Sequence, residues 1–417
     1  MRDDRPFLVL RKHRGNRFTL PVLLGCAEEK GLSKDFRVLL ASSKDEIAQK
    51  IMGTAALIGY SFMTPNLEEV REEVKWLRGN LSGAPIFMAG GAHATGDPEG
   101  TLALGFDFVF AGEAEETFPG FLHRFLAGEN PSGKILEADN RIGIHLVHPP
   151  HSLGHRFFAP IEITRGCPYG CTYCQTPRIF GHRLRHRKPE NVQFYLRQAI
   201  PHGYLQTKFI SPNAFSYGSK TPAEPDLEKL ENLLAVCQGT GLEGIHFGCF
   251  PSEVRPDWVT PGVLELVKKY CRNRTIVLGA QSGSDPLLEK LKRGHTADQA
   301  LNAARWIRQA GFRPHVDFVF GFPGETMEDR KLTLQLIDRM VQGLGAKVHA
   351  HTYMPLPGTP LFRERPSVLD RSTKETLLDW EKKKKLDGWW KEQEKIAWKI
   401  VEWRDKGIIQ GRDQPPP

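Results

Sequence analysis

Short apolar runs alternate with amphipathic segments over residues 1–129. The runs are rich in Val, Ile, Leu and Phe, and they cover Phe7–Leu10, Phe36–Leu40, Ala55–Tyr60, Pro85–Ala89 and Phe106–Phe110. The segments between them predict helices at Asp45–Met52, Asn66–Leu77 and Ala114–Leu126. Buried strands that alternate with helices are typical of a doubly wound parallel sheet. Residues 1–129 are therefore predicted to form an α/β domain.

Three of these strands end in segments that are suited to ligand binding. The segments are Ser61-Phe62-Met63, Gly90-Gly91-Ala92-His93 and Ala111-Gly112-Glu113. In a doubly wound sheet, ligands bind beyond the carboxyl ends of the strands. Glycines at two of these ends suggest that a bulky ligand lies close to the backbone. Ordinary turn chemistry is the alternative explanation of the glycines.

Residues 130–156 interrupt the alternation and are predicted to form a linker with room for one hairpin. They contain Pro131, Pro149 and Pro150, and they hold His145, His148, His151 and His155. The irregular spacing of these histidines favours a solvated linker over a metal site.

The alternation restarts at residue 157 and continues to about residue 365. Candidate strands are Phe157–Thr164, Lys208–Ser211, Gly244–Phe250, Thr275–Gln281, Pro314–Phe322 and Lys347–Tyr353. Helices are predicted between them, for example at Asn191–Ile200, Leu227–Cys237 and Thr326–Val341. This pattern predicts a partial (βα)6 parallel barrel, whose chemistry would lie at the carboxyl ends of the strands.

Residues 366–417 are predicted to form a charged helical extension with a frayed end. The basic run Lys382–Lys385 is followed by apolar residues at helical spacing. We therefore expect a packed helix with a solvated basic face, with an RNA-binding patch as the alternative. The extension also holds Trp380, Trp389, Trp390, Trp398 and Trp403. We expect these tryptophans to serve packing, the alternative being a cap over the barrel mouth.

The amino-acid composition and net charge limit the classes of protein to which the chain can belong. The 417 residues are 40% hydrophobic and 25% charged, which is ordinary for a soluble protein of more than one domain. Since no apolar run reaches the roughly 18 residues of a spanning helix, and the first apolar run is too short for a signal peptide, we expect a cytoplasmic protein without a membrane partner. The net charge of +8 is spread along the chain, which disfavours nucleic acid as a partner.

Three of the seven cysteines lie in one segment directly after the first barrel strand, at Cys167, Cys171 and Cys174. The other four are scattered among apolar neighbours as buried thiols. The odd total argues against a disulfide framework. Three thiolates on a four-iron cluster leave one iron without a protein ligand, and an open metal position is typical of a catalytic site. A structural zinc site, with His182 or His186 as fourth ligand, is the alternative.

The pattern Cys-x-x-x-Cys-x-aromatic-Cys resembles the signature of the radical S-adenosylmethionine superfamily. In that family the cysteines hold a [4Fe-4S] cluster, S-adenosylmethionine chelates the open iron, and its reductive cleavage releases a 5′-deoxyadenosyl radical. The resemblance implies that Cys167, Cys171 and Cys174 are the catalytic cluster ligands and that Tyr173 lies near the adenine. It also implies an external electron donor of the flavodoxin or ferredoxin type.

Further segments resemble the methylthiolase-like branch of the family, in the same order. The segment Phe250–Pro256 would bring a polar or charged side chain, Arg255, to the carboxylate of S-adenosylmethionine, and Glu253 of the same segment is a further candidate cofactor-binding residue. A guanidinium suits that role because it pairs bidentately with a carboxylate, and a surface ion pair is the alternative. Where many members carry a Gly-Gly-Glu-like segment that holds the amino group of S-adenosylmethionine, this chain has Ser211–Phe215, in which Asn213 would substitute.

The later barrel strands carry the rest of this resemblance. Leu278–Ser284, followed by Lys292–Thr296, resembles the segment that faces the ribose, which implies contacts by Gln281 and Ser282. Asp317–Thr326 resembles the segment whose backbone packs on adenine, which implies contacts beside Gly321 and Phe322. Met354–Pro360 resembles the end of the sixth strand.

The N-terminal domain resembles a cobalamin-binding domain, the usual partner of this branch. The resemblance places the tail of cobalamin at two strand ends, and Gly112-Glu-Ala-Glu115 matches a segment common in the radical-enzyme version. The implied cofactor-binding residues are Ser61, Phe62, Gly90, Gly91, His93, Gly112 and Glu113. Many such domains supply an axial histidine from an Asp-x-His-x-x-Gly segment. Leu10–Asn16 has His13 without that Asp or that Gly, so we expect no protein histidine on cobalt.

These resemblances imply a cobalamin-dependent radical enzyme that methylates an unactivated carbon of an unknown substrate. Radical rearrangement, ring closure and methylthiolation are the alternatives within the family. Methylthiolation is disfavoured because such enzymes usually carry a second cluster on three N-terminal cysteines, and only Cys26 is available. A cobalamin-binding or nucleic-acid-binding protein with a structural cluster is the alternative of another class. The open iron position and the segments around Arg255, Gln281 and Gly321 argue against it.

Overall fold

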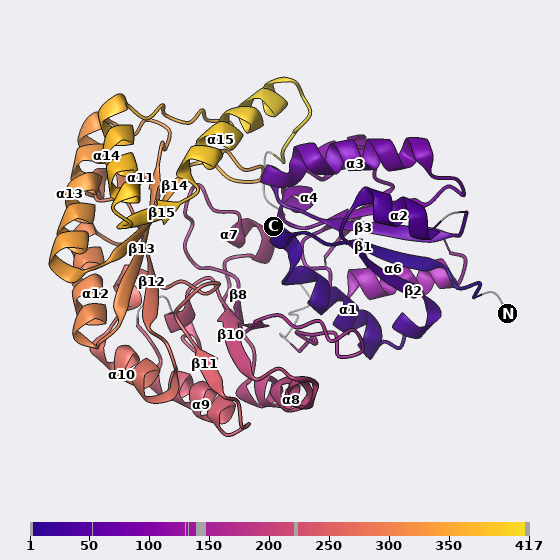
Figure 1. Cartoon of the computed structure of the whole chain (residues 1–417), viewed down its shortest axis with the longest axis horizontal. Helices are drawn as coiled ribbons and strands as arrows, with labels where there is room; N and C mark the ends of the chain where they lie inside the picture. Colours follow the sequence, from indigo (N-terminus) through magenta and orange to yellow (C-terminus); the bar gives the residue numbers. More distant parts are fainter. Residues whose placement is uncertain are drawn as a thin grey trace.

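The computed structural model shows two α/β domains side by side (Figure 1). It describes residues 3–51, 53–129, 131, 133–138, 147–220 and 224–412. Among these residues, no helix is both long and apolar enough to cross a membrane.

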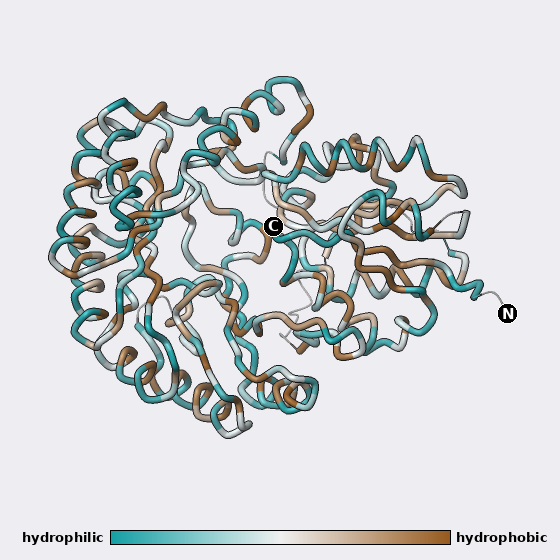
Figure 2. Tube along the Cα trace, viewed as in Figure 1, coloured by the Kyte–Doolittle hydropathy of each residue, from teal (hydrophilic) through white to brown (hydrophobic). Residues whose placement is uncertain are grey.

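The N-terminal domain is built on a parallel sheet with the strand order β2-β1-β3-β4-β5-β6. Its strands are β1 (Phe7–Arg11), β2 (Arg37–Ala41), β3 (Ala56–Ser61), β4 (Ile86–Gly90), β5 (Phe108–Ala111) and β6 (Ile135–Glu137). Its helices are α1 (Thr19–Glu29), α2 (Lys44–Ile51), α3 (Leu67–Asn80), α4 (Ala92–Gly96), α5 (Pro98–Ala103) and α6 (Thr117–Leu126). One face packs on α1 and α6 and the other on α2 and α3. The strands are accordingly apolar (Figure 2), and the prediction of a doubly wound sheet is confirmed.

The second domain is a partial parallel barrel. Its strands are β7 (Ile161–Glu162), β10 (Gln206–Ile210), β11 (Gly244–His246), β12 (Thr275–Gln281), β13 (Arg313–Phe320), β14 (Lys347–Thr352) and β15 (Leu386–Gly388). They form two sheets, β11-β10-β7 and β12-β13-β14-β15, and a parallel bridge between Val254 and Leu278 joins them. Its helices are α8 (Pro189–Ala199), α9 (Leu227–Gln238), α10 (Pro261–Tyr270), α11 (Asp285–Lys290), α12 (Ala297–Gln309), α13 (Met327–Leu344) and α14 (Arg371–Lys382).

Shorter elements complete the description. β8 (Thr164–Arg165) pairs antiparallel with β9 (Arg185–His186), and α7 (Thr176–Phe180) lies between them. The chain ends with α15 (Trp390–Asp405). Single 3-10 turns are η1 (Arg14–Asn16), η2 (Ser33–Asp35), η3 (Thr64–Asn66), η4 (Ile200–His202), η5 (Ala214–Ser216) and η6 (Pro256–Trp258).

The barrel strands separate an outer core from an open lumen. On β13, Val316 and Phe318 pack with the surrounding helices. Because side chains alternate along a strand, His315, Asp317 and Val319 face the opposite side, which is the lumen. The carboxyl ends of the strands point toward the N-terminal domain (Figure 1), so any ligand at the barrel mouth lies between the two domains.

The structure corrects two predictions about the connections. The predicted linker, residues 130–156, supplies β6, which extends the N-terminal sheet next to β5. The packed helix expected after the basic run is α15, which begins at Trp390 and buries Ala397 and Ile400. It does not follow the run directly, because α14 ends at Lys382 and β15 adds a parallel strand next to β14. His145 of the linker and the end of the tail, residues 413–417, lie outside the described residues.

The C-terminal extension returns to the N-terminal domain. Ile400 and Trp403 of α15, followed by Ile409, belong to the apolar core under α2 and α3. The backbone N–H groups of Gln410 and Gly411 then donate to Oδ1 of the fully buried Asp97, at 3.2 and 2.8 Å. The extension therefore joins the two domains.

Candidate functional site

The three cysteines lie on a loop between β8 and α7, at the barrel mouth. The loop packs tightly on the chain that precedes β9. Gly166 has a φ of +82°, and a Cβ there would come within 2.0 Å of the carbonyl oxygen of Arg183. The N–H of Cys167 donates to the carbonyl oxygen of Gly181 at 3.0 Å. Gly166 is therefore required for both the backbone conformation and the close approach.

The loop brings the three thiols close enough to interact. Burial, together with negative charge on Cys174 or Cys171, raises the pKa of Cys167 to about 11. Burial also raises the pKa of Cys174. In the described part of the chain, no three His, Cys, Asp or Glu side chains are arranged to hold a single metal ion. The ligands of an iron–sulfur cluster bind separate irons and need not converge on one point.

Arg293 is a buried cation beside the cysteine loop that sequence reasoning did not assign. Its Nη1 lies 3.6 Å from Sγ of Cys171, and its Nη2 donates to the carbonyl oxygen of Gly279 at 2.8 Å. Burial opposes its charge, but the negative charge that Tyr173 or Cys171 would carry outweighs burial and raises the pKa of Arg293. This contact places a buried cation next to one of the three cysteines of the loop. Arg293 lies within Lys292–Thr296, a segment that resembles the family, and this resemblance was the signal that could have identified it.

Arg255 and Asn213 lie together, and both have donors that form no hydrogen bond with the described residues. The N–H of Arg255 donates to Oδ1 of Asn213 at 3.2 Å. The guanidinium of Arg255 lies 3.4 Å from the ring centroid of Tyr169, and its Nε is paired with Asp257 at 3.1 Å. Nη1 of Arg255 and Nδ2 of Asn213 are buried and have no hydrogen-bond partner among the described residues. Such donors are costly to bury, so this corner of the barrel is suited to an anionic ligand.

Tyr173 and Phe322 meet in a small apolar cluster. Their ring centroids lie 5.2 Å apart, and Leu287, Leu291 and Tyr353 complete the cluster. The neighbouring Gly321 has a φ of +80° and its N–H donates to Oε2 of Glu325 at 2.7 Å. Two aromatic rings next to a strand end provide an apolar surface of the kind that a purine base needs.

Gln281 and Ser282 have different surroundings. Gln281 ends β12 after a bulge and has a φ of +69°, a strained conformation for a residue with a side chain. Backbone strain of this kind is concentrated at functional sites. Ser282 instead is buried, and its Oγ lies 3.1 Å from Oγ1 of Thr333 on α13. The prediction that Ser282 faces a ligand does not fit this position.

Two carboxylates belong to the lumen. Asp317 is 7% exposed, and Glu253 lies on the lumen side of the bridge at Val254. No described side chain donates a hydrogen bond to either carboxylate. Burial raises the pKa of Asp317 well above its usual value, and the charge of Glu253 raises it further. Glu253 is therefore placed to meet a ligand in the lumen rather than to pair with Arg255.

A cavity of about 400 Å³ lies at the carboxyl ends of β3, β4 and β5. Six predicted residues line it, namely Ser61, Phe62, Gly90, Gly91, Gly112 and Glu113. Gly91 has a φ of +93°, and a Cβ there would meet the carbonyl oxygen of Phe62 at 2.8 Å. Residues of the barrel domain, among them Phe180 and Ile210, form the opposite wall. The cavity is therefore shared by the two domains.

His93 and Glu113 lie differently from what was predicted. His93 is fully buried behind the cavity, where it stacks on Phe62 and its Nδ1 lies 3.0 Å from Oγ1 of Thr64. Burial lowers the pKa of His93 to about 3, so the ring is neutral. Glu113 does line the cavity, but both of its oxygens are paired with Arg165 and Arg185 of the barrel domain. His93 is a core residue, and Glu113 joins the two domains.

Arg165 is the centre of a buried ion network between the domains. Nη1 donates to Glu113 at 2.6 Å and Nη2 donates to Glu115 at 2.5 Å. Its remaining donors bond Glu162, also within the barrel domain. Burial raises the pKa of Glu115, but the attraction of Arg165 outweighs it and brings this pKa down to about 2. The network orients the two domains through charge-assisted hydrogen bonds.

Gln175 connects the cysteine loop directly to the N-terminal domain. This residue follows Cys174, and its Nε2 donates to the carbonyl oxygen of Ala92 at 3.2 Å and to that of Pro357 at 2.8 Å. Ala92 follows Gly91, which lines the 400 Å³ cavity. The cysteine loop and the cavity therefore share one wall.

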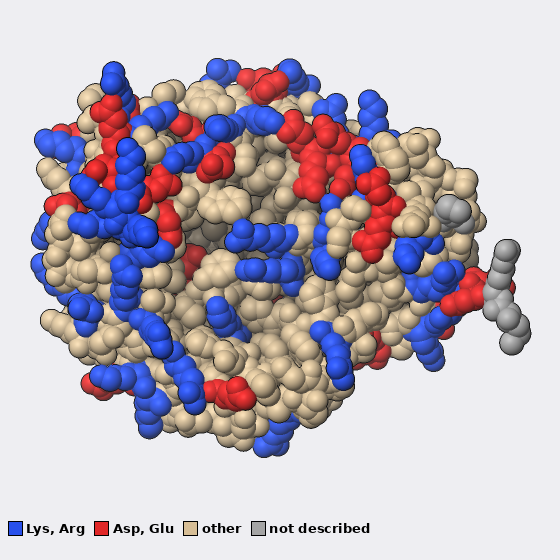
Figure 3. Space-filling view, in the orientation of Figure 1, with Lys and Arg blue, Asp and Glu red and all other residues tan. Residues whose placement is uncertain are grey.

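The barrel mouth is lined with aromatic and basic side chains. Phe250 and Trp389 are 53% and 56% exposed there. Arg17 lies 5.9 Å from the ring centroid of Phe250 and Arg14 lies 5.4 Å from that of Trp389, and both arginines belong to the N-terminal domain. The face shown in Figure 3 is hollowed near its centre, with Lys and Arg beside the hollow. Of the five tryptophans expected to serve packing, Trp380, Trp390 and Trp403 are buried, whereas Trp389 and Trp398 are exposed.

Two family models match the chain. The model of the radical SAM superfamily covers residues 161–337, and the model of the B12 binding domain covers residues 13–122. The chain belongs to the radical SAM superfamily. It is a member with a B12-binding domain in front of the barrel, and the predicted family and fold class are confirmed.

This radical SAM protein has relatives of several kinds. An uncharacterized protein of Methanopyrus kandleri is 25% identical and covers 83% of this chain and 75% of its own length. The tRNA-2-methylthio-N(6)-dimethylallyladenosine synthase of Desulfosudis oleivorans is 31% identical over 56% of this chain, which spans 49% of that synthase. The chain thus spans about half the length of such synthases.

Two solved radical SAM structures share the fold. TsrM of Kitasatospora setae, a methyltransferase with cobalamin and a [4Fe-4S] cluster bound, has a TM-score of 0.63 and 16% identity, over 86% of this chain and 77% of TsrM. OxsB, a cobalamin-dependent radical enzyme with aqua-cobalamin bound, has a TM-score of 0.58 and 15% identity, over 99% of this chain and 57% of OxsB. At these identities the likeness concerns the fold.

The radical SAM domain implies a [4Fe-4S] cluster and S-adenosylmethionine, and the B12-binding domain implies cobalamin. The residues present fit all three. The three thiols lie beside the cation of Arg293. The unused donors of Arg255 and Asn213 match a carboxylate. The shared cavity, with glycines at its wall, has room for part of a large ligand.

His13 is expected to stay off cobalt in this radical SAM protein. The N–H of Gly15 donates to its Nδ1 at 3.0 Å, which leaves the proton on Nε2, and Nε2 lies 2.9 Å from the carbonyl oxygen of Ser61. Both ring nitrogens are therefore used. Paramagnetic resonance of bound cobalt(II) should show no nitrogen superhyperfine splitting. A splitting that disappears in His13→Ala would contradict this expectation.

Proposed function

We propose that this radical SAM enzyme uses cobalamin to methylate an unactivated carbon. The observation that carries the proposal is the wall shared by the cysteine loop and the cavity, held by Gln175 between Cys174 and Ala92. A methyl donor in the cavity and a radical source on the cysteine loop would then face the same space at the barrel mouth. When bound, the cluster and S-adenosylmethionine supply hydrogen abstraction, and methylcobalamin supplies the methyl group.

The residues of the chain would bind and orient these groups. Cys167, Cys171 and Cys174 would hold the cluster, with the cation of Arg293 beside Cys171. Arg255 and Asn213 would bind the carboxylate and its neighbours on S-adenosylmethionine through their unused donors. Tyr173 and Phe322 would hold the adenine against the barrel strands.

The substrate would bind in the lumen and at its mouth. Glu253 and Asp317 have no hydrogen-bond donors among the described residues, and burial raises the pKa of both. A protonated carboxyl donates as well as accepts, so the pair would offer both kinds of hydrogen bond to a polar substrate. Phe250 and Trp389 would exclude water at the mouth. An external electron donor is required by the family chemistry.

Methylthiolation is the second candidate, because the 31% identity to a tRNA methylthio synthase extends over 56% of this chain. The N-terminal part of the chain matches a B12-binding domain instead, and this favours methylation.

Gly90→Leu tests the cobalamin site. A side chain at Gly90 meets only Phe110, at 3.8 Å, so Leu would enter the cavity without disturbing the sheet. We expect at least about a ten-fold loss of bound cobalamin, since the added side chain occupies ligand volume. Conversion of S-adenosylmethionine to S-adenosylhomocysteine by the reduced, cobalamin-loaded enzyme should fall with it, while iron content stays unchanged.

The matched control is Gly79→Leu on α3, where nothing lies within 4 Å of an added Cβ. It should bind cobalamin normally. Full cobalamin binding by Gly90→Leu, or no S-adenosylhomocysteine from the unmodified enzyme, would refute the proposal. 5′-deoxyadenosine formed without S-adenosylhomocysteine would instead indicate one of the other radical reactions.

A further inference from the structure

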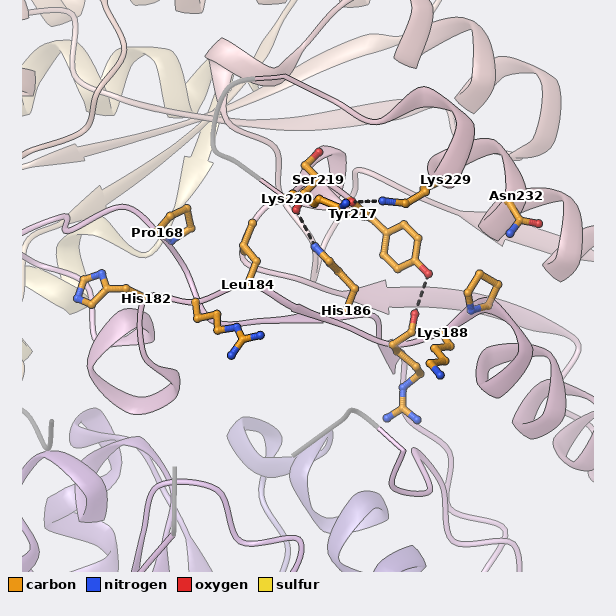
Figure 4. Close-up of a pocket in the computed structure, with 14 residues that line it drawn as sticks. Pro168, His182, Leu184, His186, Lys188, Tyr217, Ser219, Lys220, Lys229 and Asn232 are labelled. Atoms are coloured by element: carbon orange, nitrogen blue, oxygen red, sulfur yellow. Dashed lines mark hydrogen bonds between the residues drawn. The ribbon is translucent and has the colours of Figure 1, made fainter. Parts of the chain in front are cut away.

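A second cavity, of about 660 Å³, opens on the barrel domain (Figure 4). Its walls come from the β8–β9 region, the chain after β10 and α9. Arg183, Arg187, Lys188, Lys220 and Lys229 line it, and no Asp or Glu is among the described residues of its wall. We refer to this cavity as the basic pocket.

Three of these cations have side chains that form no ion pair or hydrogen bond with the described residues, namely Arg183, Lys188 and Lys220. All three are exposed, and Lys220 lies close enough to Asp226 to help lower the pKa of that carboxyl. Lys229 is different, because its Nζ donates to the carbonyl oxygen of Gly218 at 3.0 Å (Figure 4). It is also paired with Asp226. The basic pocket therefore carries uncompensated positive charge at an accessible rim.

The basic pocket lies directly against the cysteine loop. Pro168, which follows Cys167, is one of its lining residues. On the other side, the N–H of Cys167 bonds the carbonyl oxygen of Gly181, two residues before Arg183. Gly166 packs on the backbone oxygen of Arg183 itself. A partner seated in the basic pocket would thus be separated from the cluster ligands only by this thin layer of backbone.

The pocket is less suited to nucleic acid or to a small anion. Binding of single-stranded nucleic acid relies on exposed aromatic faces for base stacking. Tyr217 lines this pocket, but it is 3% exposed and its hydroxyl donates to the carbonyl oxygen of Arg187 at 2.7 Å (Figure 4). A small anion would be held by buried donors, whereas the free cations here are exposed. A large acidic surface is the better match.

We infer that the basic pocket docks an acidic one-electron donor protein beside the cluster. The inference rests on the proposed radical function, because only a cluster that must be reduced requires such a donor. In the step, the donor loses one electron and the oxidised cluster gains it. No bond forms or breaks and no proton moves. Opposite charges would steer the two proteins together and fix the side on which the donor approaches.

The test compares two triple variants of the cluster-loaded enzyme. The first is Arg183→Glu, Lys188→Glu and Lys220→Glu. The matched control is Lys75→Glu, Lys382→Glu and Lys395→Glu, which changes the net charge equally at exposed positions on α3, α14 and α15. The probe is an acidic flavodoxin, and its Kd for each enzyme is measured directly at low salt and at increasing ionic strength.

We expect the first triple variant to raise the Kd for flavodoxin at least about ten-fold, because three attractive charges become repulsive. The control variant should change the Kd less than about two-fold. Added salt should weaken flavodoxin binding only in the proteins that keep the three basic side chains, which are the unmodified enzyme and the control. Flavodoxin-driven formation of 5′-deoxyadenosine should fall in parallel. Formation driven by dithionite, which needs no docking site, should be unchanged. A triple Gln variant of the pocket should give an intermediate Kd with full iron content.

Several outcomes would overturn the inference. One is a rise in the Kd for flavodoxin that is equally large in the control. Another is an equal loss of 5′-deoxyadenosine formation with flavodoxin and with dithionite. A third is unchanged flavodoxin binding together with a loss of RNA binding, which would assign the pocket to nucleic acid. Absence of 5′-deoxyadenosine from the unmodified enzyme with dithionite would refute the radical function instead, so the two failures are distinguishable.

Discussion

Replacing Cys167, Cys171 or Cys174 with Ala should remove most of the bound iron and abolish formation of 5′-deoxyadenosine. Each thiolate would ligate one iron, and a second iron without a protein ligand would make the cluster labile. The Cys171→Ala variant should show the largest loss, because Cys171 is 5% exposed and its replacement also leaves Nη1 of Arg293 without its sulfur partner.

The measurement is iron per protein after anaerobic reconstitution, together with 5′-deoxyadenosine formed from S-adenosylmethionine and dithionite. Cys249→Ala is the matched control, because Cys249 is half-buried like Cys167 and lies outside the loop. Cys26, Cys237 and Cys271 should behave like Cys249. If Cys249→Ala lost as much iron as Cys171→Ala, the assignment of ligands would be wrong.

Replacing Arg165 with Met should be the most destabilising single change outside the cysteine loop. It would leave the carboxylates of Glu115 and Glu162 in a buried site without their cation, and Glu113 with Arg185 alone. Removing one partner of a buried ion network typically costs about 3–5 kcal/mol. We expect a loss of this order in the free energy of the first unfolding transition, measured with urea.

Arg78→Met is the control for Arg165→Met. Arg78 pairs with Asp107 at 2.6 Å, but the two side chains are 37% and 39% exposed. An exposed pair contributes about 1 kcal/mol or less. Similar losses in the two variants would show that the buried network contributes no more than an ordinary surface pair.

The pH dependence gives a second readout of the same network. The pKa of Glu115 is about 2 in the folded protein, below the usual value of 4.5, because Arg165 outweighs the effect of burial. A depressed carboxyl pKa stabilises the protein at high pH, and this stabilisation is lost as the pH falls from 4.5 to 2. The unmodified protein should lose it over this window, whereas Arg165→Met should show a smaller change there.

Features that repeat along the chain could be predicted from the sequence, whereas features that depend on contacts between distant segments could not. β1, β3 and β12 are short apolar runs, a pattern typical of buried strands. The predicted bounds of these strands therefore agree with the observed ones to within one or two residues. β15 was missed because Leu386–Gly388 is too short to show a period and forms only by pairing with β14.

The candidate site shows the same division. The spacing of the three cysteines predicted a cluster site because all three candidate ligands lie on one loop and are therefore close together in the sequence. His93 and Ser282 belong to the right segments, yet whether a strand-end side chain faces a ligand or the core depends on the packing behind it. Glu113 was assigned to a cofactor because its partners, Arg165 and Arg185, are distant in sequence. Arg293 was missed because only the folded barrel brings it to Cys171.

The contact between Asp97 and the end of the chain has a consequence for how the protein is made. During translation, the N-terminal sheet leaves the ribosome long before Gly411, which lies 314 residues after Asp97. Until then the Asp97 carboxylate lacks both of its C-terminal donors, and the core under α2 and α3 lacks Ile400 and Trp403. Of the two described domains, the N-terminal one is therefore synthesised before the barrel but completed after it. A nascent chain that stalls before α15 would expose an apolar surface and so be a natural substrate for chaperones.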